Sequence, residues 1–312
     1  MFRRSRIMPL QNTKIMLINA YKQGYGVGAF NFSNLEQMQA IIEVASEQNS
    51  PVILAASTSA IKYMNLKTLV AMVKEATKTI SAPVSLHLDH GATYEDCKAC
   101  IDAGFTSVMI DASHLNFDDN VKLTKQVVDY AKQFNVTVEA ELGKLAGVED
   151  EINHAHSHYT NPQEAKLFVE KTKVDSLAIS IGTSHGAYKF SGEPTLQIDL
   201  LKQIKALLPN TPLVLHGASS IPETLQQEFI KCGGELIGAK GVSEHLIKEA
   251  IQNGIAKVNV DSDLRLAFTV GVKQTLQNKT EFNPRTYLLA AKNKMKELLT
   301  YKIQNIFNSN QK

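Results

Sequence analysis

Six short apolar runs in this sequence are each followed at once by residues that bind metals or carry protons. One His or Asp after a strand is usually a cap or a loop anchor. Six such groups in succession are better explained by one shared polar site. The groups are His87-Leu88-Asp89-His90, Asp111, Glu139-Ala140-Glu141, His185, His216 and Asn259-Val260-Asp261.

Three histidines from three of these groups suit a divalent metal. A catalytic zinc ion uses three neutral imidazoles and keeps one coordination position open. Asp89 directly precedes one of the histidines, so it can reach a metal-bound substrate without binding the metal, which suits a general acid or base. Asp111 and Glu141 are expected to orient the ligands or to hold a second cation position. The three candidate zinc ligands are His90, His185 and His216.

Small and hydroxyl-bearing residues follow the last three apolar runs. Backbone N–H groups in turns of this kind bind anions, and α/β barrels commonly bind phosphate after strands six to eight. A lysine in the same region would add positive charge. The expected phosphate site consists of Gly186, Lys189, Gly217, Ser219, Asn259 and Ser262.

The elements that must position these residues alternate between strands and helices along the whole chain. The strands are almost continuously apolar, as is typical of parallel strands buried on both faces. Strict alternation without a linker predicts an α/β fold, a single (β/α)8 TIM barrel. A doubly wound sheet is the alternative, but no GxGxxG or Walker loop follows any strand. The eight expected strands are 27–32, 52–56, 84–88, 107–111, 137–141, 176–181, 213–216 and 257–260.

Four segments depart from a minimal barrel within the one domain of residues 1–312. Residues 143–161 form a polar stretch too long for an ordinary turn and are expected to be a mobile active-site loop. Residues 233–254 are an insertion, and 283–308 are expected to be a C-terminal helical extension. Residues 1–10 are basic, lack the apolar core of a signal peptide, and are expected to be a disordered extension.

Three other patterns have plainer structural explanations. Cys97 and Cys100 form a CxxC pair on an expected helix with no second ligand pair nearby, so they are expected to be buried apolar side chains. The HxHxH segment 154–158 is expected to be a solvated loop. His87 alternates with leucines and is expected to support the site at most. The one lysine within the eight strands, Lys257, lies at the far end of its strand, which argues against Schiff-base chemistry.

Composition excludes several classes of function. The 312 residues are 44% hydrophobic and 21% charged, as expected for a globular enzyme. The net charge is +2, and Arg3, Arg4 and Arg6 lie in the first ten residues, so the rest of the chain is close to neutral. No nucleic-acid or membrane surface is therefore expected. The apolar runs are of strand length, too short to span a membrane, and a cytoplasmic location is expected.

Eight motifs in this order resemble those of the class II fructose-bisphosphate aldolases, in particular the branch that includes the tagatose-bisphosphate enzymes. The resemblance extends from about residue 13 to residue 296. The motifs are GVGAFNFSN, HLDHG at 87–91, SVMIDASH at 107–114, VEAELG at 138–143, YTNP at 159–162, IGTSHGAYK at 181–189, PLVLHGAS at 212–219 and KVNVDSDLR at 257–265.

The resemblance implies a metal-dependent lyase that cleaves a ketose bisphosphate through an enediolate. It assigns zinc to the three histidines, acid/base catalysis to Asp89, and an alternative metal position to Asp111 and Glu141. Glu149, on the loop, would protonate the enediolate. The ketone-side phosphate of the substrate would bind to the six residues named above as the expected phosphate site.

The resemblance also implies further contacts and partners. Asp261 would hold substrate hydroxyls, and Ser57 would be another contact on the phosphate side. Arg285 matches an arginine that family members lend to the neighbouring subunit's distal phosphate, and Arg265 is a weaker candidate for that role. Members are dimers or tetramers, and a monovalent cation, Na⁺ or K⁺, often stimulates them.

Some positions depart from the family pattern, and alternatives remain. The loop usually reads Gly-Gly-x-Glu-Asp, whereas this chain has Ala146 at the first position, which is expected to affect loop kinetics rather than chemistry. Fructose 1,6-bisphosphate is the favoured substrate, because residues 261–265 resemble the fructose enzymes more. The alternatives are tagatose 1,6-bisphosphate and a non-catalytic accessory relative.

Overall fold

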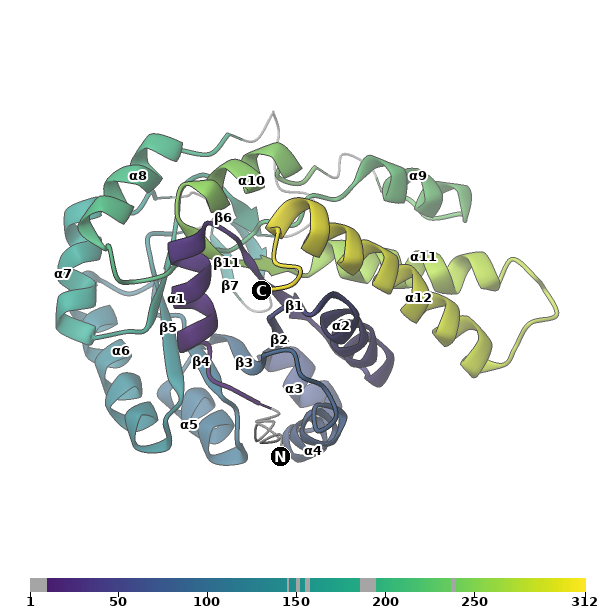
Figure 1. Ribbon diagram of the computed structural model, residues 1–312, viewed down its shortest axis with the longest axis horizontal. Helices are drawn as coiled ribbons and strands as arrows, with labels where there is room; N and C mark the ends of the chain where they lie inside the picture. Colours follow the sequence, from purple (N-terminus) through teal and green to yellow (C-terminus); the bar gives the residue numbers. More distant parts are fainter. Residues whose placement is uncertain (1–9, 145, 150–151, 155–157, 186–194, 237–239) are drawn as a thin grey trace, which may run out of the picture.

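The computed structural model describes residues 10–144, 146–149, 152–154, 158–185, 195–236 and 240–312. Eight parallel strands close into a barrel in the order β1-β11-β10-β8-β5-β4-β3-β2. The predicted (β/α)8 barrel with a C-terminal helical extension is confirmed (Figure 1). The barrel strands are β1 Val27–Asn31, β2 Val52–Ser57, β3 Val84–Gly91, β4 Ser107–Ile110, β5 Thr137–Leu142, β8 Ser176–Ile179, β10 Leu213–Leu215 and β11 Ile255–Val260.

Helices surround the barrel, and local sequence explains where several of them begin. Thr93 and Asp96 form a capping box at the start of α5. Asn161 and Asn283 cap helices that have proline in their first turn. The helices are α1 Lys14–Gln23, α2 Leu35–Gln48, α3 Thr58–Met64, α4 Leu66–Ala76, α5 Tyr94–Ala103, α6 Phe117–Ala131, α7 Pro162–Thr172, α8 Ile198–Leu207, α9 Glu223–Lys231, α10 Glu244–Gln252, α11 Ser262–Thr275 and α12 Pro284–Lys302.

The amino ends of the strands are covered by α1. Thr13, its N-cap residue, bonds through its hydroxyl to that of Thr137, the first residue of β5, at 2.8 Å. At the other end of the helix, the Tyr21 hydroxyl donates to the Leu208 carbonyl at 2.8 Å. Because α1 occupies this end, the carboxyl ends of the strands are left for a site.

The C-terminal extension is one long helix, α12, followed by a short π-helix, Ile303–Phe307. Figure 1 shows α12 beside α11, with the two projecting together from the barrel and α12 also lying along α2. Lys292 and Lys296 of α12 pair with Glu43 of α2 at 2.8 and 3.0 Å. The predicted helical tail is therefore packed onto the barrel wall.

The segment expected to be a polar loop contains regular structure. β6 Ala146–Glu149 and β7 Ile152–His154 pair as an antiparallel hairpin, and β6 also pairs with β9 Ser184–His185. The polar and apolar residues of this segment do not alternate clearly enough to predict these short strands. The predicted insertion holds α10, and residues 1–9 lie outside the described residues.

Cys97 and Cys100 are buried on α5, as predicted. None of the helices within the described ranges combines the length and the apolar character that crossing a bilayer requires.

Candidate active site

Two adjacent residues of β3, Asp89 and His90, both reach the site because the strand is irregular there. The pairing register between β3 and β4 shifts between Leu88 and Gly91. His90 has φ +51°, a left-handed conformation that is rare for a residue with a side chain. In a regular strand neighbouring side chains point to opposite faces. The bulge removes that alternation and brings both side chains to the carboxyl end of the barrel.

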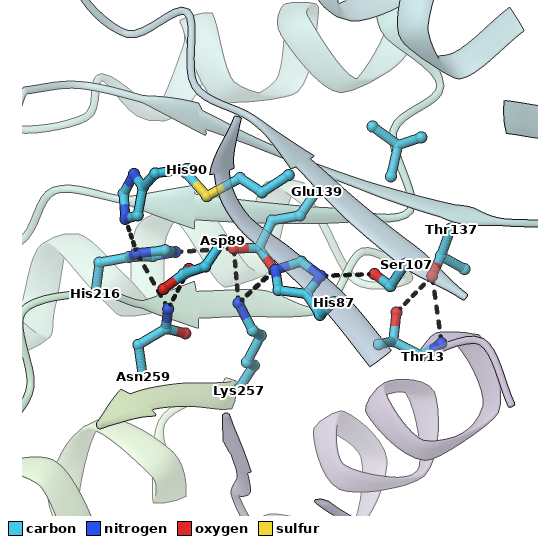
Figure 2. A network of polar contacts seen from close by, with 12 residues as sticks. Thr13, His87, Asp89, His90, Ser107, Thr137, Glu139, His216, Lys257 and Asn259 are labelled. Atoms are coloured by element: carbon cyan, nitrogen blue, oxygen red, sulfur yellow. Dashed lines mark hydrogen bonds and ion pairs between the residues drawn. The ribbon is translucent and has the colours of Figure 1, made fainter. Parts of the chain in front are cut away.

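The imidazoles of His90 and His216 face each other across this end. Nε2 of His90 lies 2.8 Å from Nδ1 of His216, with the rings nearly perpendicular (Figure 2). The other nitrogen of each ring bonds to a buried carboxylate: Nδ1 of His90 to Asp111 at 2.9 Å, and Nε2 of His216 to Glu139 at 2.8 Å. A carboxylate only accepts, so each ring donates outward and turns a lone pair toward the other ring.

Two converging lone pairs backed by carboxylates form a donor set for a cation. Metal-binding histidines usually donate their second N–H to a carboxylate, which fixes the tautomer and the ring orientation. The ligand atoms of Asp89, His90 and His216 lie within 4.8 Å of one another, as do those of His90, Asp111 and Glu141. The residues present therefore fit a divalent metal, and Asp111 and Glu141 stand where a second position was predicted.

The two supporting carboxylates are held ionised by their surroundings. Burial alone would raise the pKa of Asp111, but the hydrogen bond to His90 and those to Ser113 bring it well below its ordinary value. Burial opposes ionisation of Glu139 too, and the neighbouring Lys257 charge together with the bond to His216 brings its pKa well below its usual range. Burial lowers the pKa of His216, which favours the neutral ligand form.

A second polar layer lies beneath His216, and of its members the sequence predicted a supporting role only for His87. Nζ of Lys257 lies 2.9 Å from Glu139 and 3.3 Å from Nε2 of His87, whose Nδ1 bonds to Ser107 at 2.9 Å (Figure 2). Lys257 lies in the first half of β11, away from the carboxyl end of the strand as predicted, and its side chain points into the barrel interior and is fully buried. Its ion pair with Glu139 explains why a buried lysine is tolerated there.

Asp89 is oriented by two amide side chains. Asn31 donates to Oδ2 and Asn259 donates to Oδ1, each at 2.8 Å. Asp89 is 1% exposed. Both oxygens accept hydrogen bonds, which fix the orientation of the carboxylate and stabilise its ionised form.

Of the predicted phosphate residues, Gly217, Ser219 and Ser262 lie where β10 and β11 end, whereas the side chain of Asn259, within β11, binds Asp89 instead. Gly217 has φ +60°, and a Cβ there would lie 2.5 Å from the Ser184 carbonyl oxygen, so only glycine fits. Ser219 Oγ accepts the N–H of Asp261 at 3.3 Å. Ser262 begins α11, whose N-terminus can bind an anion. Gly186 and Lys189 lie outside the described residues.

A cavity of about 440 Å³ opens beside these residues. Asn31 lines it and also donates a hydrogen bond to Asp89, so the cavity lies next to the residues around Asp89. Arg265 pairs with Asp261 at 2.7 Å at its mouth and is exposed. Ser57, Asp261 and Arg265, all predicted from the resemblance, are thus brought together with Asn31, Ser33 and Ser59.

Other predicted residues are not brought to the site within the described chain. α12 begins at Pro284, at the outer end of the projecting helix pair (Figure 1). Arg285, its second residue, donates its backbone N–H to the cap residue Asn283. The backbones of His185 and Glu149 lie in β9 and β6, which belong to one small sheet. Their side chains lie outside what the structure describes.

Sequence reasoning missed Asn31 and Lys257 as parts of the site, and it placed Glu139 there without giving it a role. Each lies in a motif already singled out, GVGAFNFSN, VEAELG or KVNVDSDLR. Glu139 and Glu141, and likewise Lys257 and Asn259, are two positions apart on a strand, so they share a face. That spacing was the signal that could have identified the deeper layer.

Comparisons with known proteins agree with this geometry. Residues 11–312 match the family described as fructose-bisphosphate aldolase class-II. The chain is 49% identical over 290 residues to a fructose-bisphosphate aldolase of Helicobacter pylori, covering 90% of this chain and 94% of the relative. It is 49% identical over 292 residues to that of Thermus caldophilus, covering 93% and 95%.

Solved structures agree as well. The YdjI aldolase of Escherichia coli K12 superposes with a TM-score of 0.80 at 31% identity, covering 97% of this chain and 98% of that one. The fold, the paired histidines with their carboxylates and these matches lead to one assignment. The chain belongs to the metal-dependent class-II fructose-bisphosphate aldolase family and is therefore an aldolase, a carbon–carbon lyase.

Proposed function

We propose that the protein cleaves fructose 1,6-bisphosphate to dihydroxyacetone phosphate and glyceraldehyde 3-phosphate at a zinc ion. The observation that carries the proposal is the pair of imidazole lone pairs converging beside Asp89. His90 and His216 would hold the metal, with His185 as the third ligand. Zinc suits a site of three imidazoles, and when bound it would supply Lewis acidity toward the ketose carbonyl.

Asp89 is proposed as the acid/base for the bond between C3 and C4. In cleavage it takes the proton of the C4 hydroxyl, so that C4 becomes the aldehyde carbon while the electron pair remains on C3. Asn31 and Asn259 keep both of its oxygens oriented for that transfer. Glu149, carried on the β6–β7 hairpin, is proposed to return a proton to C3, and both roles reverse in condensation.

The two phosphates are proposed to bind on opposite sides of Asp89. The ketone-side phosphate would lie at Gly217, Ser219 and the N-terminus of α11 at Ser262, together with Gly186 and Lys189. The rest of the substrate would extend into the cavity lined by Ser57, Asp261 and Arg265. Arg285 is proposed to reach the distal phosphate of a neighbouring subunit in a homodimer or homotetramer. A monovalent cation, Na⁺ or K⁺, is proposed to stimulate the enzyme.

The alternatives are weaker for specific reasons. A Schiff-base mechanism needs a lysine that reaches the substrate, whereas Lys257 is fully buried and paired with Glu139. A non-catalytic relative should have lost a ligand or the acid, and Asp89, His90 and His216 are present and assembled. Tagatose 1,6-bisphosphate differs only at C4, and residues 261–265 favour the fructose substrate.

The test is a parallel assay with fructose and tagatose 1,6-bisphosphates. Purified protein is measured before and after chelation, and metal content is checked by elemental analysis. We expect about one zinc per chain, loss of cleavage on chelation, and recovery with zinc or cobalt. Full activity after verified metal removal would contradict the proposal, as would a lysine adduct trapped by borohydride. Faster cleavage of the tagatose substrate would reassign the specificity.

A further inference from the structure

The loop that follows β10 is tied to the end of the chain by a buried ion pair. We define residues 216–221 as the cradle loop: it begins at His216 and carries Gly217 and Ser219. Asp263 lies in the first turn of α11, and Lys302 is the last residue of α12. Their side chains are 0% and 1% exposed, and Nζ of Lys302 lies 2.6 Å from Oδ2 of Asp263.

Asp263 holds the end of the cradle loop with both carboxylate oxygens. Oδ2 accepts the N–H of Ser220 at 3.0 Å, and Oδ1 accepts the N–H of Ile221 at 2.7 Å. Lys302 donates to Oγ of Ser220 at 3.0 Å, so it contacts the loop directly as well. Asp263 and Lys302 together thus bind Ser220 and Ile221, the two residues that follow Ser219 in the chain.

The cradle loop needs such support because its conformation is unfavourable by itself. Ile221 has φ +47°, which β-branched residues rarely adopt because the side chain crowds the backbone. Conformations of this kind persist where surrounding structure fixes them. The Ile221 side chain is 3% exposed and packs against Leu225 and Leu266, whereas Ser220 is only half-buried and borders a cavity of about 720 Å³ between α9, α10 and α12.

We propose that Asp263 and Lys302 are positioning residues for the ketone-side phosphate, so that α12 sets the affinity of the site for its phosphorylated ligand. By fixing Ser220 and Ile221, the pair holds the neighbouring Gly217 and Ser219 in binding geometry. This inference rests on the proposed function, because that function places the phosphate at Gly217 and Ser219. A preorganised loop binds more tightly because less ordering remains to be done on binding.

The test compares Lys302→Met with Lys296→Met in the full-length, metal-loaded protein. Lys296 is on the same helix, but its partners Glu43 and Glu47 lie on α2, away from the loop. Binding of dihydroxyacetone phosphate is measured by calorimetry, well below the unfolding temperature. We expect Lys302→Met to raise its Kd about tenfold, roughly 1.4 kcal/mol, with unchanged metal content and with KM rising more than kcat falls. Lys296→Met should bind as the parent does.

Amide hydrogen exchange separates positioning from a general loss of stability. In Lys302→Met, exchange should quicken at Ser220 and Ile221 while the barrel strands keep their protection. If Lys302→Met fails to fold, the double variant Asp263→Asn with Lys302→Met replaces the ion pair by neutral groups, and the same changes are expected. Parental Kd in a folded variant would overturn the proposal, and so would faster exchange throughout the barrel. If the unsubstituted protein binds dihydroxyacetone phosphate but does not cleave fructose 1,6-bisphosphate, the proposed function is refuted, whereas the positioning role of Asp263 and Lys302 is not.

Discussion

Single side chains in this active site work in pairs, one to act and one to orient. His90 and His216 turn their lone pairs toward each other only because Asp111 and Glu139 accept the opposite N–H groups. Asp89 is held in the same way by Asn31 and Asn259. The chemistry of each acting residue therefore depends on a partner that need not touch substrate.

The two proposed acid/bases should be separable by mutation. Asp89→Ala should keep its metal but lose roughly 10²–10⁴ in cleavage rate, the usual effect of one general acid/base. Glu149→Ala should still bind dihydroxyacetone phosphate but lose solvent-proton exchange at C3 by roughly 10²-fold, about 3 kcal/mol. Deuterium uptake followed by NMR, alongside cleavage rates for both variants, measures this. If Glu149→Ala exchanges deuterium as fast as the parent, the hairpin is a lid and Glu141 becomes the next candidate donor.

His87 should make the metal-free protein sensitive to acid. Burial, followed by the nearby Lys257 charge, lowers the pKa of His87 from 6.5 to about 3. Because the unfolded chain takes up this proton near pH 6.5 and the folded chain does not, stability is full above pH 6.5. It falls as the pH drops toward 3, by at most about 1.4 kcal/mol per pH unit from this group.

His87→Gln tests that expectation, because glutamine keeps an acceptor for Lys257 and a donor for Ser107 but does not titrate. The free energy of unfolding, from urea denaturation between pH 7 and pH 5, should fall less steeply for the variant than for the parent. His216, whose pKa is also lowered, titrates in both proteins and so cancels in the comparison. Equal slopes would show that His87 does not carry the effect.

At the scale of elements, the irregular end of β3 is what allows two consecutive residues, Asp89 and His90, to point into the same site. Gly91 sits at the register shift, and a Cβ there would meet the Met109 carbonyl oxygen and a Leu88 methyl at 2.8 Å and the Cys97 sulfur at 3.1 Å. The neighbouring strand and helix therefore leave no room for a side chain. The bulge that aims His90 depends on this glycine.

Gly91→Ala should lower the unfolding temperature and weaken metal binding together, because relieving the clash must move β3 and with it His90. Overpacking of a buried site costs about 1–3 kcal/mol. Gly24→Ala is the matched control: Gly24 ends α1 with φ +72° and has nothing within 4 Å of the added Cβ. It should cost about 1 kcal/mol in stability at a left-handed position and leave metal content unchanged. If folded Gly91→Ala binds metal as fully as the parent, the bulge that orients His90 does not depend on Gly91.

At the scale of the whole molecule, the last helix connects distant parts. The first turn of α12, at the tip of the projecting helix pair (Figure 1), carries Arg285. Its last residue, Lys302, contacts Ser220 of the cradle loop. Phe282, 89% exposed, lies beside that tip. An arginine placed so far out is suited to serve a second copy of the chain rather than its own site.

Complementation between subunits tests this role of Arg285. Asp89→Ala and Arg285→Ala are each expected to be impaired as pure oligomers. Mixed and reassembled, they should regain activity, because a mixed oligomer contains sites with an intact Asp89 and an arginine supplied from the neighbour. Activity of the mixture is compared with the mean of the two separate proteins. Recovery no greater than that mean, with mixing verified by mass spectrometry, would place Arg285 outside the neighbour's site.

The sequence by itself determined the barrel and predicted which side chains would meet at its carboxyl end. Eight apolar runs predicted eight strands because buried parallel strands must be apolar on both faces, and the residues just after them had to meet at one end. That logic was sufficient for Asp89, His90, His216 and the turn at Gly217. The motifs, through family resemblance, supplied the roles.

Only the tertiary structure decided which groups orient these side chains and the loop at Gly217. Glu139 and Lys257 meet from strands that are distant in sequence, and Asp263 meets Lys302 from two different helices. Local patterns give the face on which a side chain lies but not its partner across the barrel, which depends on register and closure. The direction of His90 depended on a one-residue irregularity in β3. Such a bulge reverses the side-chain alternation, and it needs both Gly91 in β3 and the close packing of β4 and α5 against that glycine, which the sequence of β3 alone does not reveal.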